Sequence, residues 1–354
     1  DGPYVTIQDL EAPNTAIATS SDGTFNYTRS QQGFEDVMVY YHIDSYQRYV
    51  QNLQFYTLQN SPLKVDPHGL NGQDNSHFVP QGSNSRLGFG EGCVDDAEDA
   101  DVIIHEYGHA LSYAGSPGSN SGTERNGLDE GIGDYVAASY SKALTYNKWK
   151  DTFTWDGHNE CWLGRSASLN TQYPPSTSDF YVYGEIWAST LMEVYDEIGR
   201  HPCDATVFQS LYSHLANMTL TDAANVIMDA DSALTVGAHS TNFRDAFCRR
   251  GIFSGTGPGQ SCFVNAQDIT DAGLAWELFP NPNAGEFTIN IADVHRRQDL
   301  RFDVTNLLGQ PYHKGEIRQH FTKVALPELP NGMYFVRIME GEQVLATKKL
   351  EVFR

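Results

Sequence analysis

The sequence predicts an α+β protein with two parts, a larger mixed region rich in helices and a smaller antiparallel β-sandwich at its C-terminal end. Apolar residues recur at helical spacing in several segments between residues 34 and 250. From residue 278 onward, short alternating runs such as FTINI, RFDVTNL and MYFVRIM are separated by Pro, Gly and Asn, which is typical of antiparallel strands. The charge also changes between the two parts.

The negative charge is confined to the larger part. The 354 residues include 23 Lys or Arg and 45 Asp or Glu, which leaves a net charge of −22. Residues 277–354 hold 10 residues of each kind, so the whole net charge and all five cysteines lie before them. Two compositions in one chain indicate two modules. We expect a first domain over 1–270, a linker over 271–276 and a sandwich over 277–354.

The composition excludes several classes of protein. Aromatic residues make up 12% of the chain, which a disordered protein would lack. No apolar run reaches the length of about 18 residues that a transmembrane helix needs. The acidity disfavours nucleic acid and anionic membranes as partners. The chain begins without a signal-peptide pattern and carries no propeptide, so we expect a mature fragment.

Hydrophobic periodicity and turn-forming residues predict the elements of the first domain. The expected helices cover 34–53, the segment VIIHEYGHALSYAG, 128–144, 183–198, 204–215, 221–233 and 242–250. Residues 1–33, rich in Thr, Ser, Asn and Gly, predict loops and short strands. Cys248 and Cys262 bracket a Gly-rich loop and are the favoured disulfide pair, although the sequence leaves the pairing of the five cysteines open.

One segment carries the chemistry, the H-E-x-x-H motif His105-Glu106-Tyr107-Gly108-His109. His105 and His109 lie one helical turn apart on the same face, so both imidazoles can reach one metal ion. Zinc favours such ligands, and Glu106 stands where it can take a proton from a metal-activated water. The apolar flanks make burial of these side chains costly without a metal and hydrogen bonds. The competing interpretation is a chance His pair on a structural helix.

A second acidic motif follows in GLDEGIGD. Glu130 lies 21 residues after His109, which leaves room for a loop and the start of an antiparallel helix, so Glu130 is the expected third ligand. Asp134 lies one turn further and is expected to accept the other N–H of a ligand histidine. The alternative is a solvated acidic face. Gly131 and Gly133 argue against it, because glycine inside a helix costs stability unless something packs close.

HEYGHALS followed by EGIGDY resembles the gluzincin metallopeptidases, and within them the fungalysin/thermolysin-like group. The resemblance extends over much of 1–255 and includes GPYVTIQDLEAP, DNSHFVP, GEIWASTLMEVY and AANVIMDAD. It implies a thermolysin-like fold with a mixed β/loop lobe (about 1–115) and a mainly helical lobe (116–270). It also implies a secreted endopeptidase in which one zinc ion is held by His105, His109 and Glu130. Glu106 is then the general base and acid that activates water and protonates the leaving amine.

The resemblance also implies substrate contacts. Asn75 and Ser76 match positions on an edge strand that hold the substrate backbone, with an ordinary Asn-rich loop as the alternative. Tyr181 takes the place of the histidine that stabilises the oxyanion, and a phenol can donate the same hydrogen bond. The competing interpretation makes Tyr181 a core aromatic. Glu185 belongs either beside the site or on a helix surface. Three other histidines are alternative donors: His158, His201 and His239.

Calcium is a second candidate cofactor. Asp101 matches a calcium position of the family, but the expected partner position on the next helix is Ser141. The acidic stretch from Asp95 to Asp101 offers oxygen ligands for a hard cation. The alternative is a solvated start of the motif helix, where acidic residues offset the positive helix end.

The C-terminal part resembles the sorting domain of the type IX secretion system. LFPNPNAGEFTINI, VTNLLGQPYHKGEI and ALPELPNGMYFVRIMEGEQVLATKKLEV carry the resemblance, which runs from Trp276 to Arg354. It implies export across an outer membrane by the type IX machinery, and a protein that is released or attached to the surface. A generic sandwich that binds carbohydrate or rigidifies the enzyme is the alternative.

The leading hypothesis is therefore a monomeric, secreted zinc endopeptidase that acts on proteins or peptides. The second hypothesis among enzymes is an exopeptidase, which would need a charged residue to bind a substrate terminus, and the sequence offers no clear candidate for that residue. A catalytically inactive zinc-containing adhesin or binding module is the alternative from another class, although a structural zinc site has no use for Glu106. No G-x-S-x-G element is present, which disfavours a serine hydrolase.

Overall fold

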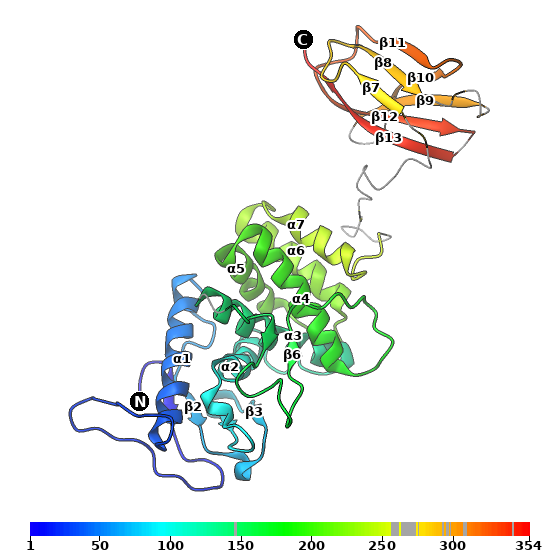
Figure 1. Ribbon diagram of the computed structural model, residues 1–354. Helices are drawn as coiled ribbons and strands as arrows, with labels where there is room; N and C mark the ends of the chain where they lie inside the picture. Colours follow the sequence, from blue (N-terminus) through cyan, green and yellow to red (C-terminus); the bar gives the residue numbers. More distant parts are fainter. Residues whose placement is uncertain are drawn as a thin grey trace. The chain divides into compact units, whose positions relative to one another are not determined.

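The chain folds into two compact units, Asp1–Cys262 and residues 263–354, in the computed structural model shown in Figure 1. The structure describes residues 1–144, 147–255, 262, 274, 276–291, 294, 297, 299–306, 310–341 and 343–354. The boundary expected at residue 270, most of the expected linker, and residues 307–309 of the LLGQ motif lie outside the described residues.

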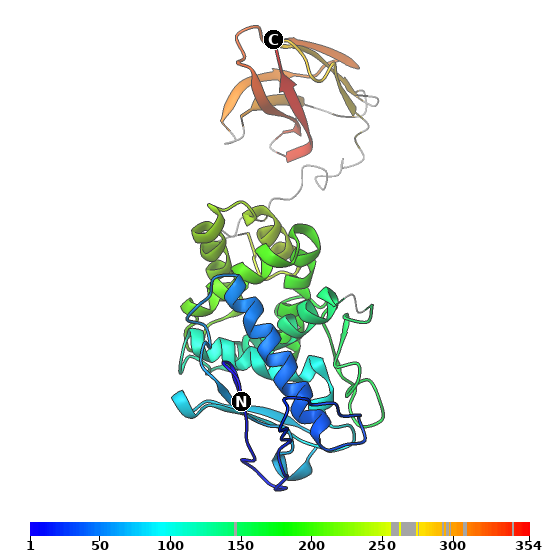
Figure 2. The ribbon, with the colours of Figure 1, turned by 90° about the vertical axis from the view of Figure 1, so that its left-hand side faces the viewer.

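The N-terminal part of the first unit combines one long helix with a small mixed sheet (Figures 1 and 2). Helix α1 (Gly33–Asn52) buries Val39, Ile43, Tyr46 and Val50, which recur at helical spacing. The sheet has the order β1-β2-β4-β3, formed by Val5–Ile7, Leu63–Asp66, Arg86–Phe89 and Ser76–Val79. Strand β3 runs antiparallel to β4 and forms an edge of the sheet. Its free side is therefore able to pair with another extended chain.

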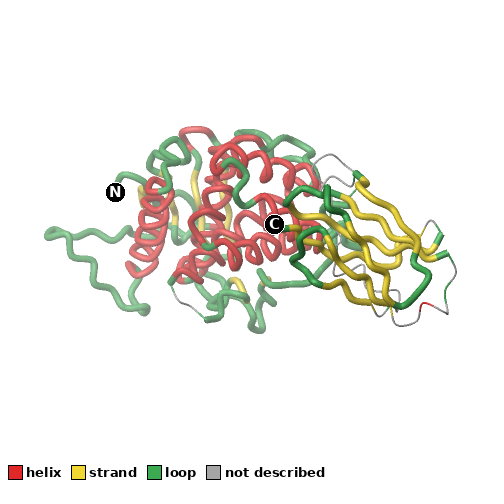
Figure 3. Tube along the Cα trace, turned by 90° about the horizontal axis from the view of Figure 1, so that it is seen from above, coloured by secondary structure: helices red, strands yellow, loops and turns green. Residues whose placement is uncertain are grey.

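The rest of the first unit is mainly helical, and Figure 3 shows these helices gathered in one group. The helices are α2 (Ala100–Gly115), α3 (Thr123–Ala143), α4 (Phe180–Ile198), α5 (Arg200–Ser210), α6 (Leu220–Thr235) and α7 (Ser240–Arg249). Two very short strands, β5 (Asp151–Thr152) and β6 (Arg165–Ser166), pair between α3 and α4. The expected helices are all present, although some of their limits differ.

Two of these helices begin four or more residues earlier than the sequence indicated. Helix α3 starts at Thr123 rather than near residue 128, and α5 starts at Arg200 rather than 204. Pro202 stands in the first turn of α5, where its missing N–H has no helical partner to lose. Gly199 therefore ends α4 and leads directly into α5.

Glycines let the three central helices approach closely. A Cβ placed on Gly108 of α2 would lie 2.9 Å from the Cα atom of Gly133 on α3. A Cβ on Gly133 itself would lie 2.5 Å from Nδ1 of His105, and one on Gly131 would lie 2.7 Å from the carbonyl oxygen of Gly184 on α4. Real Cβ atoms do not fit at such distances. These glycines therefore bring Glu130 of α3 close to the motif on α2.

The second unit consists of strands, as its alternating sequence predicts (Figure 3). One sheet has the order β10-β9-β12-β13 and the other β11-β8-β7, and the strand pairs within both are antiparallel. The strands are β7 (Trp276–Phe279), β8 (Glu286–Ile291), β9 (Leu300–Thr305), β10 (Pro311–Glu316), β11 (Phe321–Ala325), β12 (Gly332–Glu340) and β13 (Gln343–Val352). Both sheets contribute to one apolar core, which includes Phe287, Ile289, Val304, Val336 and Leu350.

Two disulfides stabilise the first unit. Cys248 pairs with Cys262, as their spacing favoured, and Cys93 pairs with Cys161 across 68 residues. Cys203 is buried and free. Among the described residues, no helix combines the length and the apolar character needed to cross a membrane.

Candidate metal centre

The motif residues lie on one buried face of α2. The Asp99 side chain caps this helix by accepting a hydrogen bond from the Asp101 amide, which satisfies a free N–H of the first turn. His105 is 4% exposed and Glu106 is 7% exposed. The rings of His105 and His109 lie 4.7 Å apart, centroid to centroid. Both imidazoles therefore stand where the spacing of the motif predicts, side by side on one face.

Glu130 reaches both histidines from α3. Its Oε2 lies 3.4 Å from Nε2 of His105, and its Oε1 lies 3.7 Å from Nε2 of His109. One ligand atom from each of the three residues falls within 4.8 Å of the others. Two imidazole nitrogens and one carboxylate oxygen form the donor set typical of catalytic zinc, which leaves a fourth position for water or substrate.

In each histidine, Nδ1 contacts a carboxylate other than that of Glu130. Nδ1 of His105 lies 3.0 Å from Oδ1 of Asp134, and Nδ1 of His109 lies 2.8 Å from Oδ2 of Asp129. With Nδ1 engaged, Nε2 of each ring is the nitrogen directed at Glu130. Such partners fix the tautomer and the orientation of metal-binding histidines. One Glu106 oxygen is also buried without a hydrogen-bond partner, so these residues fit a metal ion with a water beside Glu106.

The electrostatics of the centre favour the charged form of Glu130. Burial opposes ionisation, but His105, His109 and Arg165 outweigh it and lower the pKa of Glu130 to about 2. Burial likewise opposes the charged form of His109, yet Asp129 and the other nearby carboxylates raise its pKa to about 10. Glu130 is thus an ionised acceptor at neutral pH, as a metal ligand must be.

Two residues of the centre were not predicted from the sequence. Arg165 on β6 donates from Nε to Oδ1 of Asp134 over 3.0 Å and from Nη1 to Oε2 of Glu130 over 3.2 Å. No motif marks Arg165, because its segment lacks periodicity. Asp129 was also missed, although a signal existed: Asp129 directly precedes Glu130, so the sequence offers two adjacent carboxylates after the motif. Arg125, 1% exposed, pairs with Asp129 over 3.2 Å.

The centre opens into a cleft of about 740 Å³. Asn75, Ser76, Tyr181 and Glu185 all line it. The Asn75 carbonyl accepts a hydrogen bond from the Gly90 amide, so the alternation of an antiparallel strand leaves the Ser76 backbone on the free edge. The edge strand at Ser76 is the one that we expected from the sequence to hold the substrate backbone.

Tyr181 and Glu185 lie on the first turns of α4, on the side that faces the cleft. The Tyr181 ring is 42% exposed, and the Arg165 guanidinium carbon lies 5.1 Å from its centroid. Tyr181 is thus not a core residue. Glu185 accepts a hydrogen bond from the Ser166 amide over 3.0 Å, so it anchors β6 next to Arg165 and does not lie on an outer helix surface.

The other sequence candidates lie elsewhere. Nε2 of His158 contacts the Thr152 carbonyl over 2.9 Å, the His201 ring lies beside Tyr49, and the His239 amide donates to Asp231. None of these three histidines lines the cleft.

The calcium position expected at Asp101 and Ser141 contains direct protein contacts. Ser141 donates a hydrogen bond to Oδ1 of Asp101, and the Phe153 amide donates to Oδ2. One carboxylate oxygen therefore links α2 to α3, and the other fastens the segment after α3 onto α2. Asp101 is 3% exposed, which differs from the solvated helix start that the sequence also allowed.

Comparison with known protein families gives two matches, one for each part of the chain. Residues 4–256 match the sequence model of the fungalysin metallopeptidase family (M36). The chain belongs to the fungalysin family. Residues 277–352 match the secretion system C-terminal sorting domain. The chain thus carries the sorting domain of a secretion system, which indicates a protein that is secreted or attached to the surface.

Fungal relatives cover much of the first unit. Extracellular metalloproteinase 5 of Arthroderma otae is 28% identical over 232 residues, which is 52% of this chain and 36% of that protein. Extracellular metalloproteinase MEP of Fusarium vanettenii is 30% identical over 203 residues, which is 46% of this chain and 31% of that protein. The chain spans about a third of the length of these relatives.

A solved structure shows a similar fold. The precursor of protealysin, a metalloproteinase from Serratia proteamaculans, superposes with a TM-score of 0.50 at 14% identity. The match covers 71% of this chain and 89% of that chain. The likeness supports a thermolysin-like arrangement of the first unit.

Proposed function

We propose that the first unit is a zinc-dependent endopeptidase. One observation carries this proposal: two imidazoles, each oriented by a buried carboxylate at Nδ1, direct Nε2 at Glu130 next to an unpartnered oxygen of Glu106. A structural zinc site closes its fourth position with protein and needs no base. This pattern, within a fungalysin chain, favours catalysis over the alternative of an inactive adhesin or binding module.

The proposed ligands are His105, His109 and Glu130, and Asp134 and Asp129 orient the two rings. When bound there, zinc supplies Lewis acidity, polarising the scissile carbonyl and lowering the pKa of water. Glu106 takes the proton from the attacking water and later gives it to the leaving amine. Its buried oxygen has no competing protein partner, so it is free to accept that proton.

Other residues of the cleft hold the substrate. The free edge of β3 at Ser76, which follows Asn75 at the cleft, can pair with an extended peptide, and this pairing aligns the scissile bond along the cleft. The Tyr181 phenol, exposed at the cleft wall, is the proposed hydrogen-bond donor to the oxyanion. Arg165 orients Asp134 and Glu130 and adds positive charge on the same side.

The charges of the cleft favour an endopeptidase over a carboxypeptidase. Arg125 and Arg165 both line the cleft, and each is already paired with carboxylates of the centre. Neither is therefore available to grip a substrate carboxyl terminus. An extended substrate that continues beyond the cleft at both ends fits this arrangement.

We also infer that the second unit delivers the enzyme to the cell surface through the type IX secretion machinery. The support is the match of residues 277–352 to a secretion system sorting domain. The described part of this unit shows no cluster of metal-binding side chains, which suits a module for export rather than chemistry.

The test compares Glu106→Gln with the natural chain on an internally quenched peptide blocked at both ends. Loss of the general base lowers kcat/KM by roughly 10²- to 10⁴-fold, while metal analysis finds one zinc ion in both proteins. Glu160→Gln makes the same chemical change on an exposed residue and leaves the rate unchanged. Zinc binding without cleavage in either protein would favour the structural module instead.

A further inference from the structure

A second group of carboxylates lines the same cleft, apart from the zinc ligands. Asp74 lies just before β3, Asp96 begins a short 3-10 helix (Asp96–Glu98), and Asp156 follows β5. One oxygen of each falls within 4.8 Å of the others. Asp74 is exposed, whereas Asp96 is 2% exposed and Asp156 is 4% exposed. Three segments far apart in the sequence therefore bring three like charges together.

Two of these carboxylates are buried and unsatisfied. Oδ1 of Asp96 and Oδ1 of Asp156 are both inaccessible to solvent and have no hydrogen-bond partner. The other Asp96 oxygen accepts a hydrogen bond from Ser76. Within the described residues, no Lys, Arg or His forms an ion pair with any of the three carboxylates.

This arrangement is costly without a positive partner. Burial and the neighbouring carboxylates raise the pKa of Asp96 to about 8 and that of Asp156 to about 7. Buried carboxylates are normally paired or bound to a metal ion, because desolvation of an isolated charge is expensive. The group thus lacks the cationic partners that Asp129, Glu130 and Asp134 have.

We infer that Asp74, Asp96 and Asp156 bind a calcium ion. The donors are all oxygens, which suits a hard cation and not zinc. Calcium takes six to eight oxygen ligands in flexible geometry, and the open side of the cleft admits the waters that complete such a set. Magnesium fits less well, because it demands near-ideal octahedral geometry.

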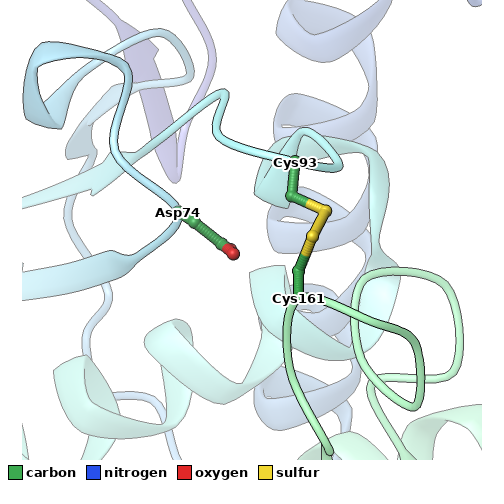
Figure 4. Close-up of side chains that lie close together, drawn as sticks. All are labelled: Asp74, Cys93 and Cys161. Carbon is green, nitrogen blue, oxygen red and sulfur yellow. A yellow bond between two sulfur atoms is a disulfide. The ribbon is translucent and has the colours of Figure 1, made fainter.

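The Cys93–Cys161 disulfide lies close to this group, and Figure 4 shows it beside Asp74. Cys93 lies three residues before Asp96, and Cys161 lies five residues after Asp156. The bond therefore fixes the two segments that carry the buried ligands. The sulfurs themselves are not ligands, because both are consumed in the disulfide.

The ion would join the two walls of the cleft. Asp96 accepts a hydrogen bond from Ser76 on the free edge strand β3. Asp156 belongs to the segment that leads to Arg165. Calcium at this position therefore positions both the strand that pairs with substrate and the strand that supports the zinc ligands. The inference concerns cation binding, and its test needs no proteolytic activity.

The test measures calcium binding to the zinc-loaded full chain. Thermal unfolding of the first unit shifts upward by roughly 5–10 °C at a calcium concentration about 100 times Kd. Terbium, a luminescent hard cation, is sensitised by Trp162, which lines the same cleft, and calcium displaces it. In the double variant Asp96→Asn, Asp156→Asn, both signals are lost. The same variant is more stable than the natural chain without calcium, because its buried like charges are gone.

Two further variants sharpen the result. Asp74→Asn changes an exposed ligand and lowers calcium affinity without disturbing the core, and Glu160→Gln keeps the full calcium response. A calcium shift that survives in the double variant overturns the site. The site is also overturned if the natural chain shows no calcium and no terbium response. In that case, a preference for peptides with Lys or Arg that Asp74→Asn removes would assign the carboxylates to substrate binding instead. Loss of zinc or of proteolysis alone tests only the proposed function.

Discussion

Two groups of carboxylates face one cleft, and they differ in their partners. At the proposed zinc centre, Asp129, Glu130 and Asp134 each contact a histidine or an arginine within 4.0 Å. At the other group, Asp74, Asp96 and Asp156 contact no such cation among the described residues. The two groups line the same cleft and consist of the same type of side chain. They differ because only the first group has positively charged partners.

The difference shows how partners select a cation. Histidines with oriented rings add nitrogen donors, and this mixture favours zinc. Oxygen donors alone, left without protein cations, favour a hard ion such as calcium. The pKa of Glu130 is lowered to about 2 whereas that of Asp96 is raised to about 8. The first carboxylate is compensated by the protein and the second is not.

The largest expected effect separates the two sites. Glu130→Gln removes the proposed anionic zinc ligand, so we expect zinc affinity to fall by more than about 100-fold, since loss of an orienting partner alone typically costs 10- to 100-fold. Peptide cleavage should fall below detection. The rise of melting temperature with calcium should persist, because Glu130 is not among the calcium ligands. Zinc titration and thermal unfolding measure the two responses. If Glu130→Gln removed both zinc binding and the calcium response, the two ions would share one site.

The second effect concerns the disulfide beside the calcium ligands. Replacing Cys93 and Cys161 by Ser should lower the free energy of unfolding by about 4 kcal/mol, given the 68-residue separation. The control replaces Cys248 and Cys262, separated by 14 residues, and should cost about 3 kcal/mol. Denaturant unfolding measures both. Only the first pair should also weaken calcium binding, and equal calcium affinity in both variants would contradict the proposed link.

The smallest effect tests the orientation of the zinc ligands. Asp129→Asn leaves an acceptor for His109 but removes the charge, so zinc affinity should fall by roughly 10- to 100-fold. Asp134→Asn should act in the same way through His105. Asp196→Asn, which changes an exposed partner of Lys142, is the matched control without effect. Competition with a chromogenic chelator reports the affinities, and unchanged values would show that these carboxylates serve folding alone.

The sequence predicted those parts of the centre that depend on local spacing. The H-E-x-x-H repeat follows from helical geometry, and Glu130 with Asp134 repeats the same one-turn interval on the next helix. The glycines in α3 were also informative, because Gly133 contacts His105 closely. The sequence did not reveal Arg165, nor the grouping of Asp74 with Asp96 and Asp156. Their segments are irregular, and irregular segments have no period from which a face can be inferred.

The sequence by itself determined which residues lie on one face of a helix or strand, since the backbone geometry of each element sets that interval. It therefore determined the imidazole pair, the base beside it, and the strand-rich character of residues 276–354. Only the tertiary structure decided which carboxylates meet across α2, α3 and the loops between them. These contacts depend on the packing of distant segments and on a disulfide between cysteines that are 68 residues apart. Long-range contacts of this kind leave no local sequence pattern.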